Sequence, residues 1–421
     1  MQTGGAPPSS ESGHRRVTAR DLWSSGNRAA STDPDVAKRR FELPGIQDLS
    51  KEQEVVRALP MDGQHLIIGG PGTGKTVVAL IRARRHLRER DEYVFLVFNH
   101  LLHRASTQLF SGELAGATWW VWFRDRFESA TGATLPREPA ERGGFRPIDW
   151  NGVARIVAGK PPIDDPPALV IDEGQDMPPE FYRALVALGF DRFFVAADQN
   201  QALTDKHSSR ENIETHLAID TDDVIELTHN YRNCGPVAKL ARAFYTGDPA
   251  SPSVDLPSTP GPAAWLCDYA PRRFADICRR IVKIVDRDPA TLLGVIAPNN
   301  DVRRRYVDGL KAQTGALENG VPRIDTFFGQ HHRPDVRFDE GGILVINAQA
   351  CKGLESDVAV LADIDRHYVP PTDLDAVKKR FYVMVARARE RVILLRQRDA
   401  NSRIEEILPN DRAVLKRRDL V

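Results

Sequence analysis

The chain has 421 residues, which is enough for two or three domains with hydrophobic cores. Its 58 basic and 58 acidic side chains cancel, which argues against a basic protein that coats nucleic acid and leaves a local groove for any such contact. No stretch has the ~20 apolar residues of a membrane span, the N-terminus lacks an apolar signal core, and the four cysteines form no CxxC pair, so we expect a cytoplasmic protein without a membrane partner, disulfides or zinc.

Residues 1 to about 40 are rich in Ser, Gly, Pro and Arg without periodicity, and they are predicted to be a flexible tail. Apolar runs of strand length then recur along the chain, as expected of strands that are buried on both faces of a sheet. The Pro-rich stretch at 246–262 divides them into two series. The runs are 65–70, 93–98, 168–173, 192–198 and 223–229, followed by 292–298, 342–348, 357–363 and 391–396.

Amphipathic segments lie between several of these runs. In residues 75–90, for example, the near-helical spacing of four apolar residues predicts one buried face; they are Val77, Leu80, Ile81 and Leu87. Alternation of apolar runs with such helices is typical of parallel sheets that carry helices on both faces. We expect an α/β fold with two domains, at 41–235 and 236–421, and a small accessory insertion at about 100–165 in the first.

The sequence "GGPGTGKT" at 69–76 fits the phosphate-loop pattern GxxxxGK[ST] and lies between a predicted strand and a predicted helix. Backbone N–H groups of such a loop, together with the helix N-terminus, bind phosphates. Lys75 is predicted to contact the β- and γ-phosphates of ATP, and Thr76 is predicted to bind Mg²⁺. The loop itself consists of Gly70, Pro71, Gly72, Thr73 and Gly74.

A second apolar run, "LVIDEGQD" at 169–176, ends in two acidic residues. Asp172 is predicted to hold Mg²⁺, and Glu173 is predicted to polarise the attacking water. An Asp-Glu pair alone is a weak signal, but about 100 residues after a phosphate loop it indicates a Mg-dependent nucleotide hydrolase.

Further stretches follow in a characteristic order: "LSKEQEVV" (49–56), "AADQNQAL" (196–203), "LTHNYRN" (227–233), "NAQACKGLESDVAV" (347–360) and "FYVMVARARERVIL" (381–394). With the phosphate loop and the acidic strand, they resemble the motifs of superfamily I helicases of the UvrD/Rep/PcrA kind. The resemblance covers roughly residues 44 to 396. It implies two RecA-like P-loop NTPase domains, with ATP in the cleft between them and single-stranded nucleic acid across the top.

The resemblance also implies roles for single residues. Gln53 corresponds to the residue that reads adenine, and Gln201 to the glutamine that senses the γ-phosphate. Gly353 and Glu355 correspond to a turn that contacts the sugar and phosphates of the nucleotide. Arg232 and Arg387 correspond to arginines that reach the γ-phosphate from across the cleft, and such an arginine contributes ~10³–10⁵ in rate. Arg389 is expected to be a surface or ion-paired residue instead.

The nucleic-acid side departs from the family pattern. No aromatic residue follows Gln201, Gln349 replaces a histidine, and Ala386 replaces a threonine. In the cluster "TWWVWFRDRF" at 118–127, the aromatic residues Trp122, Phe123 and Phe127 have helical spacing and are predicted to be core. The residues predicted to contact nucleic acid are Phe98, Asn99, Thr118, Trp119, Trp120 and Gln349, with base stacking on the two tryptophans balanced against a core role.

These observations favour an ATP-dependent helicase or translocase on single-stranded nucleic acid, DNA rather than RNA, with 3′→5′ polarity by analogy. The short insertions, missing aromatic residue and neutral charge leave an alternative open. In it, the chain is a nucleic-acid-stimulated regulatory ATPase subunit of a repair or defence complex, with a partner such as a nuclease and no unwinding activity of its own. A metabolic P-loop kinase is a third and weaker hypothesis, since it leaves the motifs near 230 and 385 without a role.

Overall fold

The computed structural model describes residues 43, 46–110, 113–140, 146–199, 207–247, 252, 254–315, 317–327, 336–398 and 402–420. The predicted tail at 1 to about 40 and the predicted γ-phosphate sensor Gln201 lie outside these residues. Within them, no helix is both long enough and apolar enough to cross a membrane.

The first sheet has six parallel strands in the order β3-β2-β4-β5-β1-β6. The strand β5 lies between β1, which leads into the phosphate loop, and β4, which carries the acidic pair. Because the strands are parallel, the carboxyl ends of β1 and β4, which carry the predicted site residues, lie at the same edge of the sheet. The strands are β1 (Gln64–Gly69), β2 (Tyr93–Val97), β3 (Gly116–Thr118), β4 (Ala168–Asp172), β5 (Phe193–Ala197) and β6 (Ile225–Leu227).

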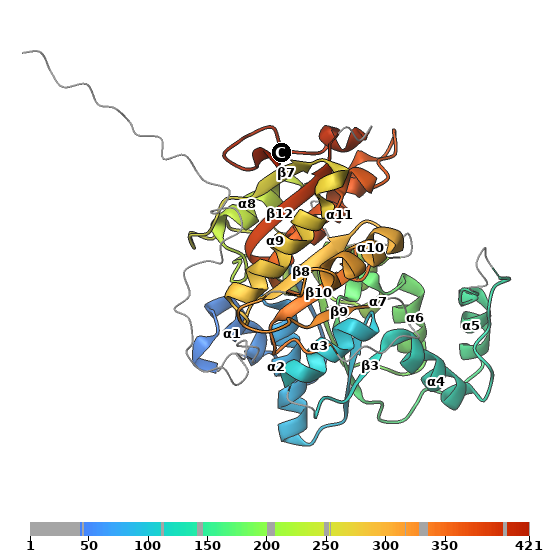
Figure 1. Ribbon diagram of the computed structural model, residues 1–421. Coiled ribbons are helices and arrows are strands. Elements are labelled where there is room, and N and C mark those ends of the chain that lie inside the picture. Colours follow the sequence, from blue (N-terminus) through green and yellow to red (C-terminus); the bar gives the residue numbers. More distant parts are fainter. Residues whose placement is uncertain are drawn as a thin grey trace, which may run out of the picture.

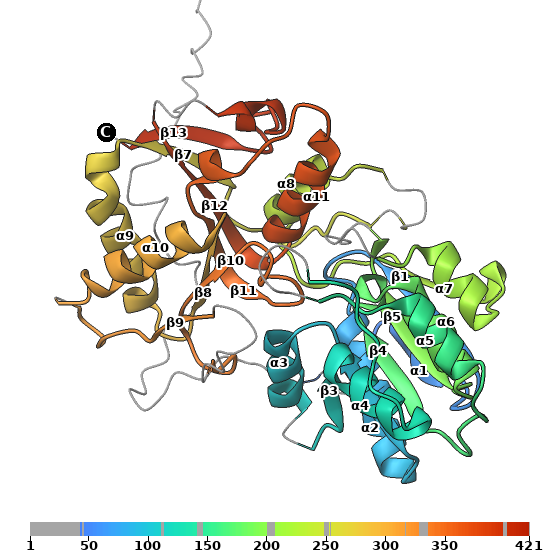
Figure 2. The same ribbon diagram turned by 90° about the vertical axis from the view of Figure 1, so that its right-hand side faces the viewer.

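The second sheet has seven parallel strands in the order β13-β7-β12-β11-β8-β10-β9. Figure 2 shows it beside the first sheet, each with its own helices. Two parallel sheets flanked by helices confirm the predicted α/β fold with two RecA-like sheets. The strands are β7 (Trp265–Tyr269), β8 (Leu292–Ala297), β9 (Ile324–Thr326), β10 (Gly342–Asn347), β11 (Ser356–Leu361), β12 (Ala388–Gln397) and β13 (Lys416–Leu420).

Helices cover both faces of each sheet, as Figure 1 shows for the whole chain. In the second sheet, neighbouring residues of β8 point to different cores: Leu292 packs with α8 and α11, whereas Leu293 packs with α9 and α10. Burial of both faces explains why the central strands are continuously apolar. The helices are α1 (Lys51–Ala58), α2 (Lys75–Glu89), α3 (His100–Phe110), α4 (Trp119–Thr131), α5 (Trp150–Val157), α6 (Pro179–Ala187), α7 (Arg210–Leu217), α8 (Gly235–Ala243), α9 (Phe274–Arg287), α10 (Asn300–Lys311) and α11 (Leu374–Val385).

All nine apolar runs form strands, which confirms that part of the prediction. The range 100–165, predicted as an accessory insertion, contains α3, β3, α4 and α5. Because β3 pairs with β2, this range also supplies the outermost strand of the first sheet.

The predicted buried face of α2 is confirmed at Leu80, which is fully buried, and wrong at Leu87. Leu87 is 40% exposed, whereas Arg82 and His86 are buried. The small side chains Ala79 and Ala83 lie on the buried face and allow the helix to pack closely on the sheet. Burial of Arg82 is possible because its guanidinium donates to the carbonyls of Leu59 and Pro60 after α1.

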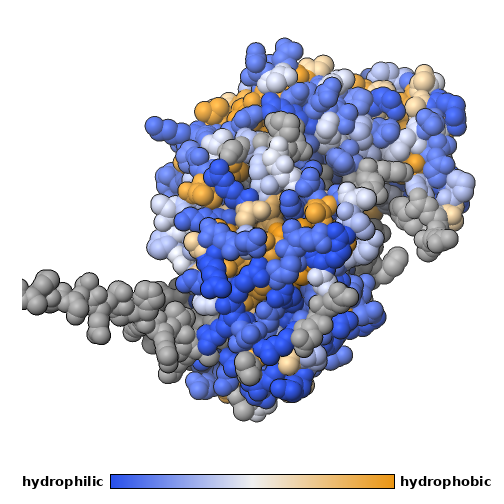
Figure 3. All heavy atoms as spheres, turned by 90° about the horizontal axis from the view of Figure 1, so that it is seen from above, coloured by the Kyte–Doolittle hydropathy of each residue, from blue (hydrophilic) through white to orange (hydrophobic). Residues whose placement is uncertain are grey.

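Figure 3 shows one face of the molecule coloured by hydropathy. In the view of Figure 3, hydrophilic side chains predominate and hydrophobic residues form small separate groups. This agrees with the balanced composition of the chain.

Candidate nucleotide site

The phosphate loop joins β1 to α2, and two of its glycines have positive φ angles, 81° at Gly72 and 90° at Gly74. A Cβ atom at Gly72 would lie 2.3 Å from the side-chain oxygen of Asn230, and one at Gly74 would lie 2.2 Å from Nε2 of Gln53. Side chains are therefore excluded at both positions by conformation and by space.

Lys75 opens α2, and its ammonium group points back into the loop. Nζ donates to the carbonyl oxygens of Gly69 at 2.7 Å and Gly70 at 2.8 Å, and it lies 3.4 Å from a carboxylate oxygen of Asp198. The side chain is buried. A positive charge is thus held at the centre of the loop, where predicted phosphate binding requires it.

The two acidic residues lie at the end of β4. Thr76 donates from its hydroxyl to Asp172 Oδ2 at 2.7 Å, so the two predicted Mg²⁺ ligands are in direct contact. Asp172 is fully buried, and burial together with the neighbouring charge of Glu173 raises its pKa to about 7. A buried carboxylate with a raised pKa gains stability from a bound cation.

Glu173 has the opposite electrostatic setting. Burial would raise its pKa, but the charges of Lys352, Lys75 and Arg387 outweigh burial, so the pKa is lowered. Gln175 orients the carboxylate by donating to Oε2 at 2.6 Å. The predicted base is therefore kept ionised and fixed in direction.

Lys352 comes from the second sheet and enters this first-sheet centre. Its Nζ lies 2.6 Å from a carboxylate oxygen of Asp176 and 4.0 Å from Oε2 of Glu173. All three side chains are buried. The sequence reasoning assigned Lys352 no role, although it directly precedes the predicted Gly353 turn.

Two predicted arginines lie near this region: Arg232 in the segment after β6 of the first sheet, and Arg387 between α11 and β12 of the second. Arg232 is ion-paired with Glu355, with Nε 3.2 Å from Oε2. Arg387 donates to the carbonyl oxygens of Val383 and Leu354, and it is buried. Arg389 also lies near Glu355, at 3.7 Å, which confirms the expectation that it is ion-paired.

The segment 228–234 connects the phosphate loop to the second sheet. The N–H group of Tyr231 donates to the Gly72 carbonyl at 2.9 Å. Asn233 then donates to the carbonyls of Ala386 and Ala388, on either side of the predicted arginine finger. The segment 228–234 is therefore hydrogen-bonded both to the phosphate loop and to the start of β12, directly after Arg387.

A cavity of about 510 Å³ lies between the two sheets, beside these residues. Gln53 lines it, but its amide is already engaged: Nε2 donates to the Thr73 carbonyl and Oε1 accepts from the Ser50 N–H group. These bonds use one of the two donors of the amide nitrogen and one of the two acceptor positions of the amide oxygen. The cavity walls are formed by Asp48, Gln53, Gly72, Gly74, Thr76, Val77, Leu102, Ala105, Ser106, Leu109, Tyr231, Arg232, Phe338, Gly353, Leu354, Glu355 and Arg389.

Tyr231 is a residue that the sequence reasoning missed. Its side chain is 54% exposed and lines the cavity with Gln53 and Asp48. Exposed aromatic rings beside a polar cavity are suited to stacking on a base. The signal that could have found it is its position directly before Arg232.

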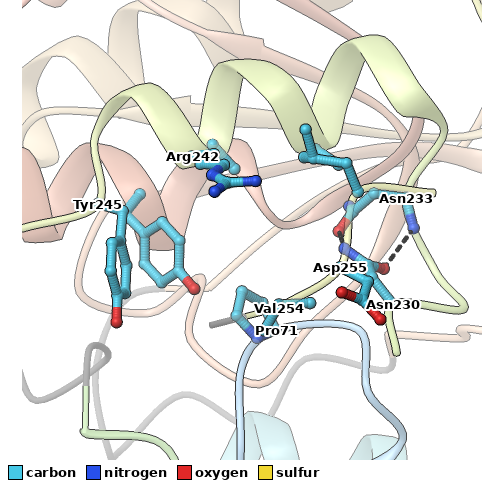
Figure 4. Close-up of a pocket in the computed structure, with 11 residues that line it drawn as sticks. Pro71, Asn230, Asn233, Arg242, Tyr245, Val254 and Asp255 are labelled. Atoms are coloured by element: carbon cyan, nitrogen blue, oxygen red, sulfur yellow. Dashed lines mark hydrogen bonds between the residues drawn. The ribbon is translucent and has the colours of Figure 1, made fainter. Parts of the chain in front are cut away.

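A second, small cavity of about 40 Å³ lies behind the phosphate loop. Figure 4 shows Pro71 of the loop opposite Arg242 of α8 and Tyr245, which follows that helix, with the hydrogen bond between Asn230 and Asn233 at one side. It is too small for a nucleotide. Its walls show that α8 packs near the loop.

The residues predicted to contact nucleic acid are divided among several environments. Asn99 uses its side-chain oxygen to accept from the Leu102 N–H group at the start of α3, and Gln349 is exposed after β10. Thr118 is buried before α4, and Phe98 is half-buried against the core of the first sheet. Among the described residues, no hydrogen bond joins any two of these four side chains.

The two candidate stacking tryptophans are both half-buried. Trp119 packs edge-on against Phe181, and Trp120 has the guanidinium of Arg137 4.3 Å from its ring centre. Phe123 and Phe127 are fully buried, which confirms their predicted core role. Trp122 is half-buried and packs on Phe190.

No protein-family profile matches the chain, and no curated protein matches it in sequence. Solved structures that resemble it include the C-terminal domain of a possible DNA helicase from Lactobacillus plantarum WCFS1, with 13% identity, a TM-score of 0.32 and coverage of 44% of this chain and 98% of that one. Another is the DUF1998 helicase MrfA bound to DNA, with 11% identity and a TM-score of 0.45. That alignment covers 84% of this chain and 49% of MrfA, so this chain spans about half the length of that protein. At such identities the similarity concerns the fold.

Proposed function

We propose that the chain is a Mg-dependent ATP hydrolase that couples turnover to movement along single-stranded nucleic acid, DNA in preference to RNA, with 3′→5′ polarity. One observation carries this proposal. Charged groups from both sheets lie close together at the end of β4: Lys75 and Glu173 belong to the first sheet, and Arg387, which precedes β12 of the second sheet, lies close enough to lower the pKa of Glu173. A hydrolase that uses a single sheet has no need of such an arrangement.

The residues at the cavity suit a nucleoside triphosphate and Mg²⁺. The glycine loop and the start of α2 offer N–H groups to phosphates, and Lys75 adds a positive charge. Thr76 and Asp172 would hold Mg²⁺, which would neutralise charge between the phosphates. Their existing contact of 2.7 Å and the raised pKa of Asp172 fit a cation-binding role.

Glu173 is assigned the role of orienting and deprotonating the attacking water. Its lowered pKa keeps it ionised at neutral pH, and Gln175 fixes its carboxylate. Gln175 also accepts from the N–H group of Asp198, which belongs to the segment after β5. Gln175 thereby connects Glu173, the proposed base, to the backbone of Asp198, which precedes Gln201 in the sequence.

Coupling to movement follows from the origin of the arginines. Arg387 precedes β12 and can stabilise charge on the transferred phosphoryl group only when the second sheet is close to the first. Arg232 lies in the segment that is hydrogen-bonded to the phosphate loop, and it pairs with Glu355, which directly precedes β11. Hydrolysis then requires cleft closure, and product release allows opening. The residues Asn99 and Gln349, at the ends of β2 and β10, would meet the nucleic acid on the two sides of this cleft.

One observation favours the alternative of a regulatory ATPase subunit without unwinding activity. Trp119 packs edge-on against Phe181 and Trp120 has the guanidinium of Arg137 over its ring, so less of each half-buried ring is available as a stacking platform. Without such platforms, nucleic acid would stimulate hydrolysis but the chain would separate strands only together with a partner protein, such as a nuclease.

ATP hydrolysis measured with single-stranded DNA, single-stranded RNA and duplex DNA tests the proposal. We expect single-stranded DNA to stimulate the wild-type protein several-fold and the Lys75→Ala variant to lose nucleotide binding and turnover. Displacement of streptavidin from the 5′ end but not the 3′ end of biotinylated DNA would report 3′→5′ movement. An ATPase rate indifferent to every nucleic acid would refute the proposal.

A further inference from the structure

Helix α3 belongs to the hydrophobic cores of both sheets. Leu102 and Phe110 pack in the core of the first sheet, with α2 and β2. Leu101 and Ala105, on another side of the same helix, pack in the core of the second sheet. Figure 2 shows α3 at the side of the first sheet that faces the second. A helix of the first half of the chain is therefore a shared element of both cores.

The second-sheet partner of α3 is the short segment 336–338, which precedes β10. The side chains of Val336 and Phe338 are buried in the same core as Leu101 and Ala105. Their burial removes apolar surface from water at the junction between the sheets. The contact is therefore a packed interface and not only a surface hydrogen bond.

Gln108 adds directional bonds to this interface. Its amide nitrogen donates to the Val336 carbonyl at 2.7 Å, and its amide oxygen accepts from the Phe338 N–H group at 2.8 Å. Arg104, one turn earlier, donates to the same Val336 carbonyl at 2.9 Å. The side-chain amide of Gln108 thus pairs with a carbonyl and an N–H group of the segment 336–338. These two bonds fix both the position of the segment along α3 and its distance from the helix.

The same helix also forms a wall of the nucleotide cavity. Leu102, Ala105, Ser106 and Leu109 line it, and Phe338 lines it from the second-sheet side. Ser106 is buried and its hydroxyl has no hydrogen-bond partner among the described residues. The interface between α3 and 336–338 therefore closes one part of the cavity, and the segment with Tyr231 and Arg232 bounds another.

We propose that Gln108 is a positioning residue that holds the second sheet on α3 and thereby sets the width of the nucleotide cavity. Its kinetic consequence rests on the proposed ATPase function, whereas the contact itself does not. If the cavity walls are already held in place before the nucleotide binds, less conformational entropy is lost on binding. Since α3 starts directly after Asn99, a predicted nucleic-acid contact, the same joint links that contact to the cavity.

The Gln108→Met variant tests this inference, because methionine keeps the length of the side chain but makes neither amide bond. Thr107→Ala is the matched control: Thr107 is the neighbouring residue, and its hydroxyl bonds back to the His103 carbonyl within α3. Both variants should retain the wild-type melting temperature within ~2 °C. Three quantities are measured for each: amide exchange of Phe338, small-angle scattering without nucleotide, and the steady-state kinetics of ATP hydrolysis.

We expect Gln108→Met to accelerate exchange of the Phe338 amide and to broaden the pair-distance distribution of the whole molecule in small-angle scattering. The KM for ATP should rise about 5-fold, as expected for the loss of such bonds, and stimulation by single-stranded DNA should fall, whereas Thr107→Ala should match the wild type. Unchanged exchange and scattering in Gln108→Met would overturn the inference, and so would altered exchange with wild-type kinetics. If the wild type hydrolyses no ATP, the proposed function fails, and exchange and scattering still decide whether Gln108 holds the joint.

Discussion

Arg232 and Glu355 form an ion pair across the edge of the 510 Å³ cavity between the two sheets, with guanidinium Nε 3.2 Å from carboxylate Oε2. Both residues line that cavity, and both are partly exposed, at 20% and 26%. Such a pair contributes little stability by itself, because solvent screens it. Its importance is positional: Glu355 holds the guanidinium of Arg232 at the cavity before a phosphate competes for it.

Replacement of Arg232 by alanine is predicted to reduce ATP turnover by about 10³-fold or more while nucleotide binding is retained. The reason is that the arginine stabilises charge that develops on the transferred phosphoryl group, and Lys75 and the glycine loop still bind the ground state. Single-turnover hydrolysis and binding of a fluorescent ATP analogue measure the two effects. Arg398→Ala is the control, since Arg398 is a surface residue paired with Asp419. Normal turnover in Arg232→Ala would disprove the assignment.

Replacement of Lys352 by methionine is predicted to shift the acid limb of the kcat/KM profile to higher pH. Lys352 is the charge that most strongly lowers the pKa of Glu173, so its loss raises that pKa. Glu173 must be ionised to accept a proton, and the variant therefore loses activity at a higher pH than the wild type as the pH falls. Lys352→Arg keeps the charge and should keep the wild-type limb. Identical limbs in Lys352→Met and wild type would show that Glu173 is not the base.

The strands that the sequence predicted and those that it missed differ in their place in the sheet. The nine predicted runs include every interior strand except β7, and burial on both faces of such strands requires continuous apolar residues; the runs also include the edge strand β6. Of the missed strands, β3, β9 and β13 lie at sheet edges, and β13 reads "KRRDL" because one side of an edge strand remains open. The fourth, β7, pairs with β13 and contains Asp268, whose carboxylate binds Arg396 of β12. A polar residue that is paired with a distant side chain interrupts the apolar pattern of a strand. In a single sequence such a segment therefore resembles a loop.

The candidate site was predictable where backbone shape dictates residue type. The glycines and Lys75 have a fixed spacing within one local turn, and Asp172 and Glu173 are adjacent at the end of one strand. Such local patterns can be recognised in the amino-acid sequence alone. The pairings of Lys352 with Asp176 and of Arg232 with Glu355 join residues more than 100 positions apart, and no local rule predicts them. The same limit applies to α2, where burial of Arg82 depends on carbonyls at the end of α1.

Replacement of Asp172 by asparagine is predicted to stabilise the protein in the absence of Mg²⁺ and to abolish hydrolysis. Burial raises the pKa of Asp172 from 3.8 to about 7, so this carboxyl group costs stability as the pH rises from 3.8 to about 7. The free energy of unfolding of Asp172→Asn should exceed that of the wild type by about 1 kcal/mol or more at neutral pH, since one pKa unit corresponds to about 1.4 kcal/mol. Chemical denaturation at several pH values measures this difference, which should disappear in acid.

Magnesium provides the complementary measurement for Asp172. Adding MgCl₂ should stabilise the wild type against denaturation but leave Asp172→Asn unchanged, because the variant lacks the carboxylate that binds the cation. Asp419→Asn is a suitable control, since Asp419 is 63% exposed and remote in function. Equal magnesium effects on Asp172→Asn and wild type would contradict the assignment of the metal ligand.

Replacement of Tyr231 by alanine is predicted to raise the KM for ATP about 5-fold or more while kcat changes little. The exposed ring lines the cavity beside Gln53, whose own amide is engaged with Thr73 and Ser50, so the base depends on stacking more than on hydrogen bonds. Tyr231→Phe keeps the aromatic face and should retain the wild-type KM. Because stacking is tolerant of base identity, GTP and ATP should lose affinity to a similar extent in Tyr231→Ala. A loss confined to ATP would contradict base stacking as the role of Tyr231.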